Sequence, residues 1–142
     1  MKPNVIVFFT DQQRADTTGA GGNPCGLTPN FDRVAFTGTY ASTAVTPQPV
    51  CGPARAVLQT GRYATCTGNY RNAIPLLRDQ KTMAHYFRDA GYDTAYIGKW
   101  HLASGRREVP REERGGYDWW LGANALEATS RPYDTLVYDN EN

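Results

Sequence analysis

The sequence predicts an α/β fold in which a largely parallel sheet is flanked by helices. A β-branched and aromatic run from Asn4 to Phe9 is typical of a strand buried on both faces. A second strand-like run, Asp93 to Ile97, follows a helical segment that Gly91 closes. Because strands alternate with helices, we expect parallel strands whose carboxyl ends share one edge of the sheet, where ligands collect in such folds.

Local signals place the next elements in order. A short helix is predicted to begin with Thr28 as N-cap and Pro29 in the first turn, and to end at Gly38. Its residues expected to face inward are Phe31, Val34 and Ala35. The segment from Thr39 to Val45, between the two runs named above, is interpreted as a further short strand.

Two further helices are predicted, from Pro53 to Thr60 with Gly61 after it, and from Lys81 to Ala90 with Thr82 as N-cap. The charged stretch from Gly105 to Arg114 is expected to be an exposed loop. No element is assigned to the aromatic-rich remainder of the chain.

The composition excludes several classes of function. The chain has 142 residues, 40% of them hydrophobic, with a net charge of +1, so nothing favours binding to nucleic acid or to an anionic membrane. The longest apolar run, Val5 to Phe9, is far below the roughly 20 residues that span a bilayer. We expect a cytoplasmic protein as written, or a periplasmic or secreted one if a signal segment has been removed.

Cys51 is the cysteine most suited to chemistry. Three cysteines are present, with no C-x-x-C spacing, which disfavours a disulfide framework. Cys51 stands just before a predicted helix, whose unpaired N–H groups and dipole favour a thiolate or a bound oxyanion. Arg55 lies one turn further on and can reach the same point. Cys25 and Cys66 are interpreted as structural.

Four blocks of sequence carry a family resemblance. Cys51 to Arg55, with Leu58 to Arg62 after it, matches the pattern C-x-P-x-R…L-x-T-G-R. Gly98 to Leu102 reads Gly-Lys-Trp-His-Leu, Asn4 to Asp11 is an apolar run ending in an acid, and Thr28 to Asp32 reads Thr-Pro-Asn-Phe-Asp. In this order they resemble the sulfatase family of the alkaline phosphatase-like superfamily.

The resemblance implies a partial sulfatase sandwich and a catalytic set. In sulfatases the cysteine of this signature is oxidised to formylglycine, whose hydrated form attacks the sulfur of a sulfate ester. Cys51 would carry that group and Arg55 would stabilise it. Lys99 would contact sulfate or diol oxygens, and His101 would bond the diol hydroxyl.

The resemblance also implies a divalent cation, usually calcium, with Asp11 as a ligand and Gln12 as its neighbour. Carboxylate and amide oxygens suit calcium, because it is a hard cation. The cation, Lys99 and Arg55 would neutralise the charge that develops in the reaction. The implied substrate is a small-molecule or carbohydrate sulfate ester.

Several alternatives stay open. Many sulfatases have a second Asp where this chain has Gln12. The Asp11-Gln12 pair resembles a branch that includes bacterial sulfatases and the related phosphonate monoester hydrolases, so a phosphonate monoester hydrolase or phosphodiesterase is an alternative. Asp11 could cap a loop, Lys99 could be a surface lysine, His101 a core histidine and Arg55 a helix-surface arginine.

Sulfatases run to several hundred residues, so residues 1–142 are interpreted as the N-terminal part of one catalytic domain, with no second domain. Because later ligands are missing from this stretch, we expect weak calcium binding and little turnover, or a non-catalytic remnant. Uncovered sheet edges and apolar faces also favour self-association.

Overall fold

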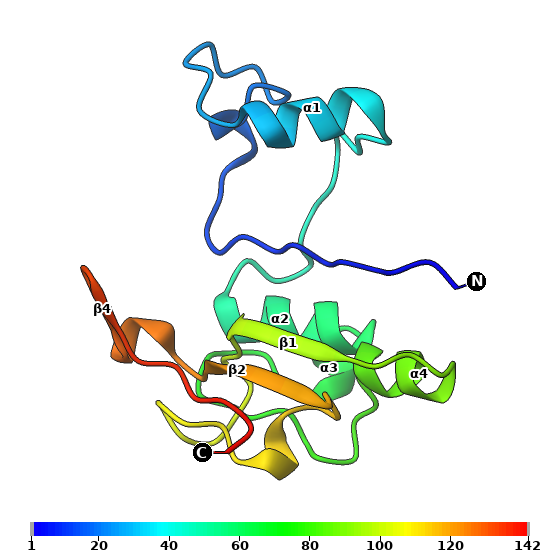
Figure 1. Cartoon of the computed structure of the whole chain (residues 1–142), viewed down its shortest axis with the longest axis vertical. Coiled ribbons are helices and arrows are strands. Elements are labelled where there is room, and N and C mark those ends of the chain that lie inside the picture. Colours follow the sequence, from blue (N-terminus) through cyan, green and yellow to red (C-terminus); the bar gives the residue numbers. More distant parts are fainter. Residues whose placement is uncertain (1, 142) are drawn as a thin grey trace. The chain divides into compact units, whose positions relative to one another are not determined.

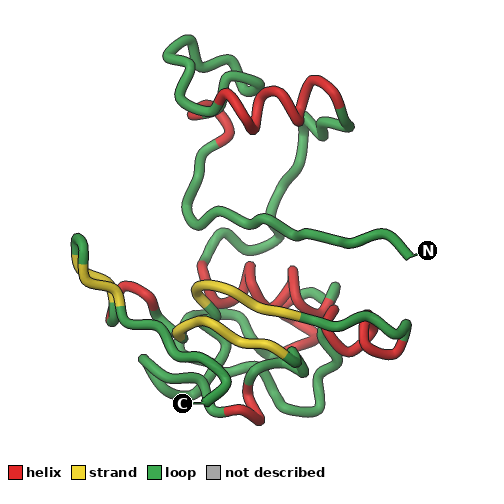
Figure 2. The backbone as a smooth tube through the Cα atoms, in the orientation of Figure 1, coloured by secondary structure: helices red, strands yellow, loops and turns green. Residues whose placement is uncertain are grey.

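The computed structural model describes residues 2–141 and divides the chain into two compact units, residues 1–45 and 46–142. The first unit contains the 3-10 helix η1 (Ala15–Thr17) and the helix α1 (Pro29–Thr37). The remainder of its described chain is loop, as Figure 2 shows.

The second unit contains the other helices and the strands of the described chain. In chain order they are α2 (Cys51–Thr60), α3 (Ala64–Thr67), α4 (Met83–Asp89), β1 (Ala95–Lys99), η2 (Arg111–Glu113), β2 (Trp119–Ala123), η3 (Leu126–Ala128), β3 (Ser130–Arg131) and β4 (Asp134–Thr135). Strands β1 and β2 lie side by side with α2 next to β1, and β3 and β4 form a small antiparallel hairpin (Figure 1).

The pairing of β1 with β2 confirms the predicted α/β class with a parallel sheet. The two strands run parallel with Ala95 opposite Trp119 and Lys99 opposite Ala123. The predicted strand from Asp93 to Ile97 is therefore present, shifted two residues toward the C-terminus. Strand β2 was not predicted. Their connection, residues 100–118, contains no α-helix.

The core of the second unit lies on one face of this sheet. It consists of Ala56, Leu76, Trp100, Leu102, Ala103, Val109 and Trp120, with Tyr96 and Tyr117 packed against them. Tyr96 stacks on Trp120 with ring centroids 4.9 Å apart and meets Trp100 edge-on at 5.0 Å. Aromatic pairs of this kind stabilise a core beyond the area that they bury. Trp100, only 1% exposed, is thus a packing residue, as its apolar ring suggests.

Three predicted helices are confirmed with small changes at their ends. Helix α1 has Thr28 as N-cap and Gly38 as C-cap, and α4 begins after Thr82, whose side chain and that of His85 form a capping box. Helix α2 begins at Cys51, two residues earlier than predicted, and ends at Gly61 in the left-handed conformation. The local capping signals were sufficient to locate these elements.

The predicted strands Asn4–Phe9 and Thr39–Val45 are wrong: both segments are loop in the structure. Ile6 and Phe8 are each 89% exposed, although the pattern predicted burial on both faces. A strand needs a neighbour that accepts its backbone hydrogen bonds, and within the described residues neither segment belongs to a sheet. An apolar β-branched run gives a propensity but cannot supply that neighbour.

The inward face predicted for α1 is also wrong. Phe31 is 49% exposed and Val34 is 59% exposed. The described part of the first unit contains no buried hydrophobic side chain that could form a core around them. Amphipathic spacing identifies the apolar side of a helix, whereas burial depends on what packs against that side.

The stretch from Gly105 to Arg114 is only partly the exposed loop that was predicted. Val109 is fully buried and Arg114 is 4% exposed. The Nε of Arg114 donates to the carbonyl of Val109 at 2.9 Å, and its guanidinium lies 5.3 Å from the Trp120 ring centroid. Burial lowers the pKa of Arg114, and the charge of Glu108 opposes that effect. A charged residue inside a loop can therefore serve as a core residue when its donors are satisfied.

Candidate active site

The cysteine of the candidate site, Cys51, is the first residue of helix α2 and is half-buried. Val50 is the N-cap in an extended conformation, and the backbone N–H of Gly52 donates to Oδ1 of Asn72 at 2.8 Å. A Cβ placed on Gly52 would lie 3.1 Å from that oxygen and 3.5 Å from the carbonyl oxygen of His101. The small residue beside Cys51 thus lets the start of α2 approach the His101 backbone closely.

Arg55 joins α2 to the end of β1. Arg55 is only 8% exposed, and its Nη1 donates to the carbonyl oxygen of Lys99 at 2.5 Å. The hydroxyl of Tyr96 donates to the same carbonyl, and Nη1 also lies 3.4 Å from that hydroxyl. Arg55 is therefore not the exposed helix-surface arginine considered as an alternative; its cation is held at the carboxyl end of the strand.

Lys99 and His101 come from the carboxyl end of β1 and the turn after it. Both side chains are largely shielded, at 12% and 14% exposure. The backbone N–H of Trp100 donates to the carbonyl of Ala123 at 2.9 Å, and the backbone N–H of His101 donates to the carbonyl of Asn124 at 2.7 Å. These bonds continue the parallel pairing beyond the strand ends and fix the backbone from which the two side chains project.

The backbone of His101 adopts a left-handed conformation, with φ of +60°. For a residue with a side chain this region costs energy and persists only where the surroundings enforce it. Here the hydrogen bond to Asn124 and the close approach of α2 at Gly52 supply that constraint. Strain at a candidate catalytic residue is consistent with a pre-organised site.

One acidic residue of this site, Glu127 of η3, was missed by the sequence reasoning. A carboxylate oxygen of Glu127 lies 3.0 Å from Nζ of Lys99, and the other lies 3.9 Å from Nε2 of His101. Glu127 lies in the segment for which no element was predicted, and it belongs to no recognisable motif. Only the three-dimensional structure brings it to the end of β1.

Asn124 was missed as well, and it supports the loop that follows His101. It is 3% exposed, its Nδ2 donates to the carbonyls of Ala103 and Gly105, and its Oδ1 accepts the N–H of Ala103 at 3.1 Å. A buried amide that satisfies backbone groups in this way orders a loop that has no regular structure. Its position directly after an unrecognised strand gave no signal.

The predicted metal ligands belong to the first unit. Asp11 and Gln12 are both exposed, and Gln12 has φ of +40°. Their oxygens are of the type that a hard cation prefers, yet two adjacent side chains supply too few donors for calcium. Among residues 2–141, no group of three or more His, Cys, Asp and Glu side chains is arranged to hold a metal ion. The placement of Asp11 and Gln12 beside Cys51 stays a prediction.

The second unit thus brings together the start of the Cys51 helix, Arg55, Lys99 and His101 around the carboxyl end of a parallel strand. Three of these residues carry cationic or proton-bearing side chains with little exposure. Fold and site together define an α/β protein with a candidate catalytic centre for an anionic group. No helix among the described residues is long and apolar enough to cross a membrane.

The chain belongs to the sulfatase family, because the family described as Sulfatase matches residues 3–141. It is 42% identical over 144 residues to an ulvan-active sulfatase of Formosa agariphila, covering 99% of this chain and 27% of that protein. It is 42% identical over 130 residues to an uncharacterized sulfatase, YidJ, of Escherichia coli, covering 88% of this chain and 26% of that protein. The chain therefore spans about a quarter of the length of these relatives.

Solved structures agree with this assignment. A putative sulfatase yidJ from Bacteroides fragilis superposes with a TM-score of 0.76 at 25% identity, covering 91% of this chain and 34% of that one. A second structure, in complex with its substrate D-glucosamine-2-N,6-O-disulfate, superposes with a TM-score of 0.66 at 35% identity over 85% of this chain and 23% of that one. The predicted alkaline phosphatase-like class is thereby confirmed. The family generally uses a formylglycine and a divalent cation.

Proposed function

We propose that this chain supplies part of the catalytic domain of a sulfuric ester hydrolase, with Cys51 as the precursor of the formylglycine. The observation that supports the proposal is the approach of the end of β1 to the start of the Cys51 helix: Arg55 donates to the Lys99 carbonyl, and a Cβ on Gly52 would lie 3.5 Å from the His101 carbonyl oxygen. These residues come from two sequence blocks more than forty positions apart. Family membership gives the reaction class, and the geometry supports the assignment of these four residues to it.

The cationic side chains fit the charge changes of sulfate ester hydrolysis. A hydrated formylglycine at Cys51 would supply the oxygen nucleophile for attack on sulfur, from which the alcohol would leave. Negative charge moves onto the departing oxygen, and a pre-organised cation lowers the energy of that state. We assign the sulfate oxygens to Lys99, and Arg55 supports this role because it donates to the Lys99 carbonyl at the end of β1.

His101 is assigned to the diol hydroxyl. A histidine held in a fixed backbone conformation can donate or accept one proton near neutral pH. Its backbone carbonyl already lies against the residue that follows Cys51. The backbone of His101 therefore borders the start of the Cys51 helix, which supports this assignment.

Asp11 and Gln12 are proposed to contribute oxygens to a calcium ion. The donor chemistry fits a hard cation, and the remaining ligands must come from elsewhere in the complete site. The cation would add to the neutralisation that Lys99 and Arg55 provide for the anionic group. Magnesium is the alternative that the same oxygens allow.

The proposed substrate is a sulfated carbohydrate. One structural relative is described in complex with a disulfated glucosamine, and another with a neocarrahexaose. Several polar and aromatic side chains of a sugar site are expected outside this chain, which covers 23% and 25% of those two proteins.

Peptide mapping by mass spectrometry tests the proposal directly. The chain is co-expressed in aerated cells with a sulfatase-maturing enzyme that oxidises the thiol with dioxygen as the electron acceptor. We expect the Cys51 peptide to lose one sulfur and two hydrogens and to gain one oxygen, while the Cys25 and Cys66 peptides keep their thiols. A Cys51→Ala chain serves as the control. An unmodified Cys51 under conditions that mature a known sulfatase would overturn the proposal.

A further inference from the structure

We infer that Glu127 is a positioning residue of the site, which holds the Lys99 ammonium in place and raises the proton affinity of His101. The inference rests on the proposed function for its catalytic meaning, but the electrostatic claim concerns only residues of this chain. It assigns a role to a carboxylate in η3 that no sequence motif indicates.

The geometry is that of one carboxylate shared by two bases. One oxygen of Glu127 lies 3.0 Å from Nζ of Lys99, and the other lies 3.9 Å from Nε2 of His101. Lys99 and His101 are two positions apart and therefore project from neighbouring points of the same chain segment. A single carboxylate therefore lies within ion-pair range of both side chains.

The three side chains differ in exposure, and the two bases are more shielded than the carboxylate. Lys99 and His101 are 12% and 14% exposed, whereas Glu127 is 52% exposed. The carboxylate therefore reaches from the solvent side onto a shielded ammonium and a shielded imidazole. An opposite charge at this distance stabilises the charged form of a partly buried group more than that of a solvated one.

The ionisation of Glu127 agrees with this arrangement. Partial burial opposes its negative charge, but hydrogen bonding to its own backbone and to Lys99, with the charges of Lys99 and His101, outweighs burial and lowers the pKa of Glu127. Glu127 is consequently ionised throughout the neutral range. The cations that face it are Lys99 and His101, while the guanidinium of Arg55 lies against the carbonyl of Lys99.

Hydrogen bonds order the backbone around this contact. The His101 N–H donates to the Asn124 carbonyl at 2.7 Å, and Asn124 in turn holds the loop at residues 103–105. Residue 124 lies three positions before Glu127. The pairing that orders the end of β1 therefore also positions the start of η3.

The function that follows is orientation and proton supply. Glu127 would keep Lys99 directed at the anionic group and would keep a larger fraction of His101 protonated near neutral pH. A protonated His101 can donate to a diol oxygen or to a departing oxygen. Removal of the carboxylate takes away the negative charge that favours a protonated His101. The repulsion between the Lys99 ammonium and a protonated His101 then stands unopposed, so the pKa of His101 falls.

The two histidines of the chain make the test specific. The imidazole ¹H–¹³C signals of His101 and His85 are followed by NMR across the pH range in the wild-type chain and in Glu127→Gln. We expect the pKa of His101 to fall by about 0.5 to 1 unit in Glu127→Gln, with discounting for the exposure of the carboxylate. The pKa of His85, which lies in the capping box of α4, should not change.

Glu112→Gln is the matched control, because it removes the same charge from an exposed carboxylate 3.4 Å from Arg78. It should leave His101 unchanged. Glu127→Asp retains the charge on a shorter side chain and should give an intermediate pKa, which keeps the test usable if the Gln variant folds poorly. An unchanged His101 pKa in Glu127→Gln, or an equal fall in Glu112→Gln, overturns the inference.

Failure of this inference and failure of the proposed function give different results. An unmodified Cys51 would remove the sulfatase assignment without affecting the His101 titration. A His101 pKa that is the same in Glu127→Gln and in the wild-type chain would have no bearing on the conversion of Cys51. In a complete enzyme carrying the same residues, the expected signature of Glu127→Gln is a shift of the pH profile of kcat toward acid.

Discussion

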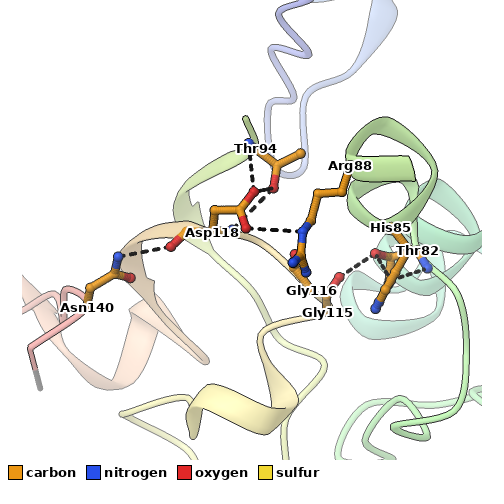
Figure 3. Close-up of polar contacts among 8 residues, drawn as sticks. All are labelled: Thr82, His85, Arg88, Thr94, Gly115, Gly116, Asp118 and Asn140. Carbon is orange, nitrogen blue, oxygen red and sulfur yellow. Dashed lines mark hydrogen bonds and ion pairs between the residues drawn. The ribbon is translucent and has the colours of Figure 1, made fainter. Parts of the chain in front are cut away.

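The carboxylate of Asp118 joins the beginning of β2 to the beginning of β1 through Thr94. Oδ2 of Asp118 accepts the Thr94 N–H at 3.1 Å and the Thr94 hydroxyl at 2.8 Å, and Oδ1 lies 3.1 Å from Nε of Arg88 (Figure 3). The backbone of Asp118 donates back to Thr94. This reciprocal pairing sets the register in which Lys99 and Ala123 come together at the far end of the sheet.

Asp118→Asn is expected to destabilise the chain by about 1 to 2 kcal/mol at pH 7, because charged acceptors make the stronger hydrogen bonds. The Thr94 hydroxyl lowers the pKa of Asp118 most, burial opposes it, and the Thr94 backbone and the Arg88 charge add to the lowering. A folded-state pKa below the unfolded value gives stability that is present above pH 3.8 and lost as the pH falls through the folded pKa. Urea denaturation at pH 7 and pH 3 measures both effects.

The deficit of Asp118→Asn should shrink toward acid, since the wild-type chain then loses the same contacts. Asp89→Asn is the matched control, because Asp89 is 68% exposed and its ion pair with Lys81 is 3.4 Å long. It should change the free energy of unfolding by less than about 0.5 kcal/mol. Equal destabilisation by the two substitutions would show that the Asp118 contacts carry no special weight.

Arg55→Met is expected to destabilise the second unit by about 2 to 4 kcal/mol. The substitution keeps an apolar stem and removes the donor to the Lys99 carbonyl, which would leave a shielded acceptor at the end of β1 with one partner fewer. Arg62→Met, which removes an exposed arginine bonded to Gln80, should have almost no effect. Thermal or urea unfolding of both variants checks the difference. Similar stability of the two would contradict the joining role assigned to Arg55.

Calcium is expected to bind the isolated chain with a dissociation constant weaker than about 1 mM, which is the weak end for protein calcium sites. The reason is the donor count: Asp11 and Gln12 are adjacent oxygen donors, and no metal-binding group of three is present among the described residues. Isothermal titration, with Asp11→Asn as the control, measures this directly. Micromolar binding that is lost in Asp11→Asn would mean that the chain itself completes the site.

The elements that the sequence predicted well are those with local signals at their ends. Helix α2 is bounded by Gly61 in the left-handed conformation, and Thr82 caps α4 through its side chain. Such signals act within a few residues and therefore survive any change in the remainder of the fold. The strand before Trp100 and His101 was predicted to end at Ile97, but β1 continues through Gly98 to Lys99.

The features that the sequence did not predict depend on contacts between distant residues. Strand β2 begins with two tryptophans and ends in Gly122 and Ala123, and only pairing with β1 makes it a strand. The run from Asn4 to Phe9 has the opposite character, with strong β propensity and no ladder among the described residues. Glu127 reaches Lys99 because η3 follows β2, which no local pattern could indicate.

Gly122→Ala is expected to destabilise the β1–β2 pair by more than about 2 kcal/mol. A Cβ at this position would lie 2.4 Å from the carbonyl oxygen of Gly98, which is backbone and cannot rotate away. Gly61→Ala is the matched control: it has open space for a Cβ, and its φ of +67° makes a cost of about 1 to 2 kcal/mol the expected result. Urea denaturation ranks the two, and a milder effect for Gly122→Ala would refute the close approach.

The face of the β1–β2 pair opposite the core is expected to promote self-association. Ile97, Trp119 and Leu121 are 77%, 64% and 43% exposed, although parallel strands are ordinarily covered on both faces. With a net charge of +1, little electrostatic repulsion opposes contact between two copies. Sedimentation velocity over a range of concentrations should therefore show dimers or larger species.

Ile97→Lys should shift this equilibrium toward the monomer, because it places a charge in the centre of the exposed apolar face. Leu77→Lys is the matched control, since Leu77 is 58% exposed but belongs to a loop outside the sheet. It adds the same charge to the chain and should leave the association unchanged. If both lysines dissociate the oligomer equally, net charge and not the sheet face controls association, and a wild-type chain that stays monomeric at high concentration would show that this face attracts no second copy.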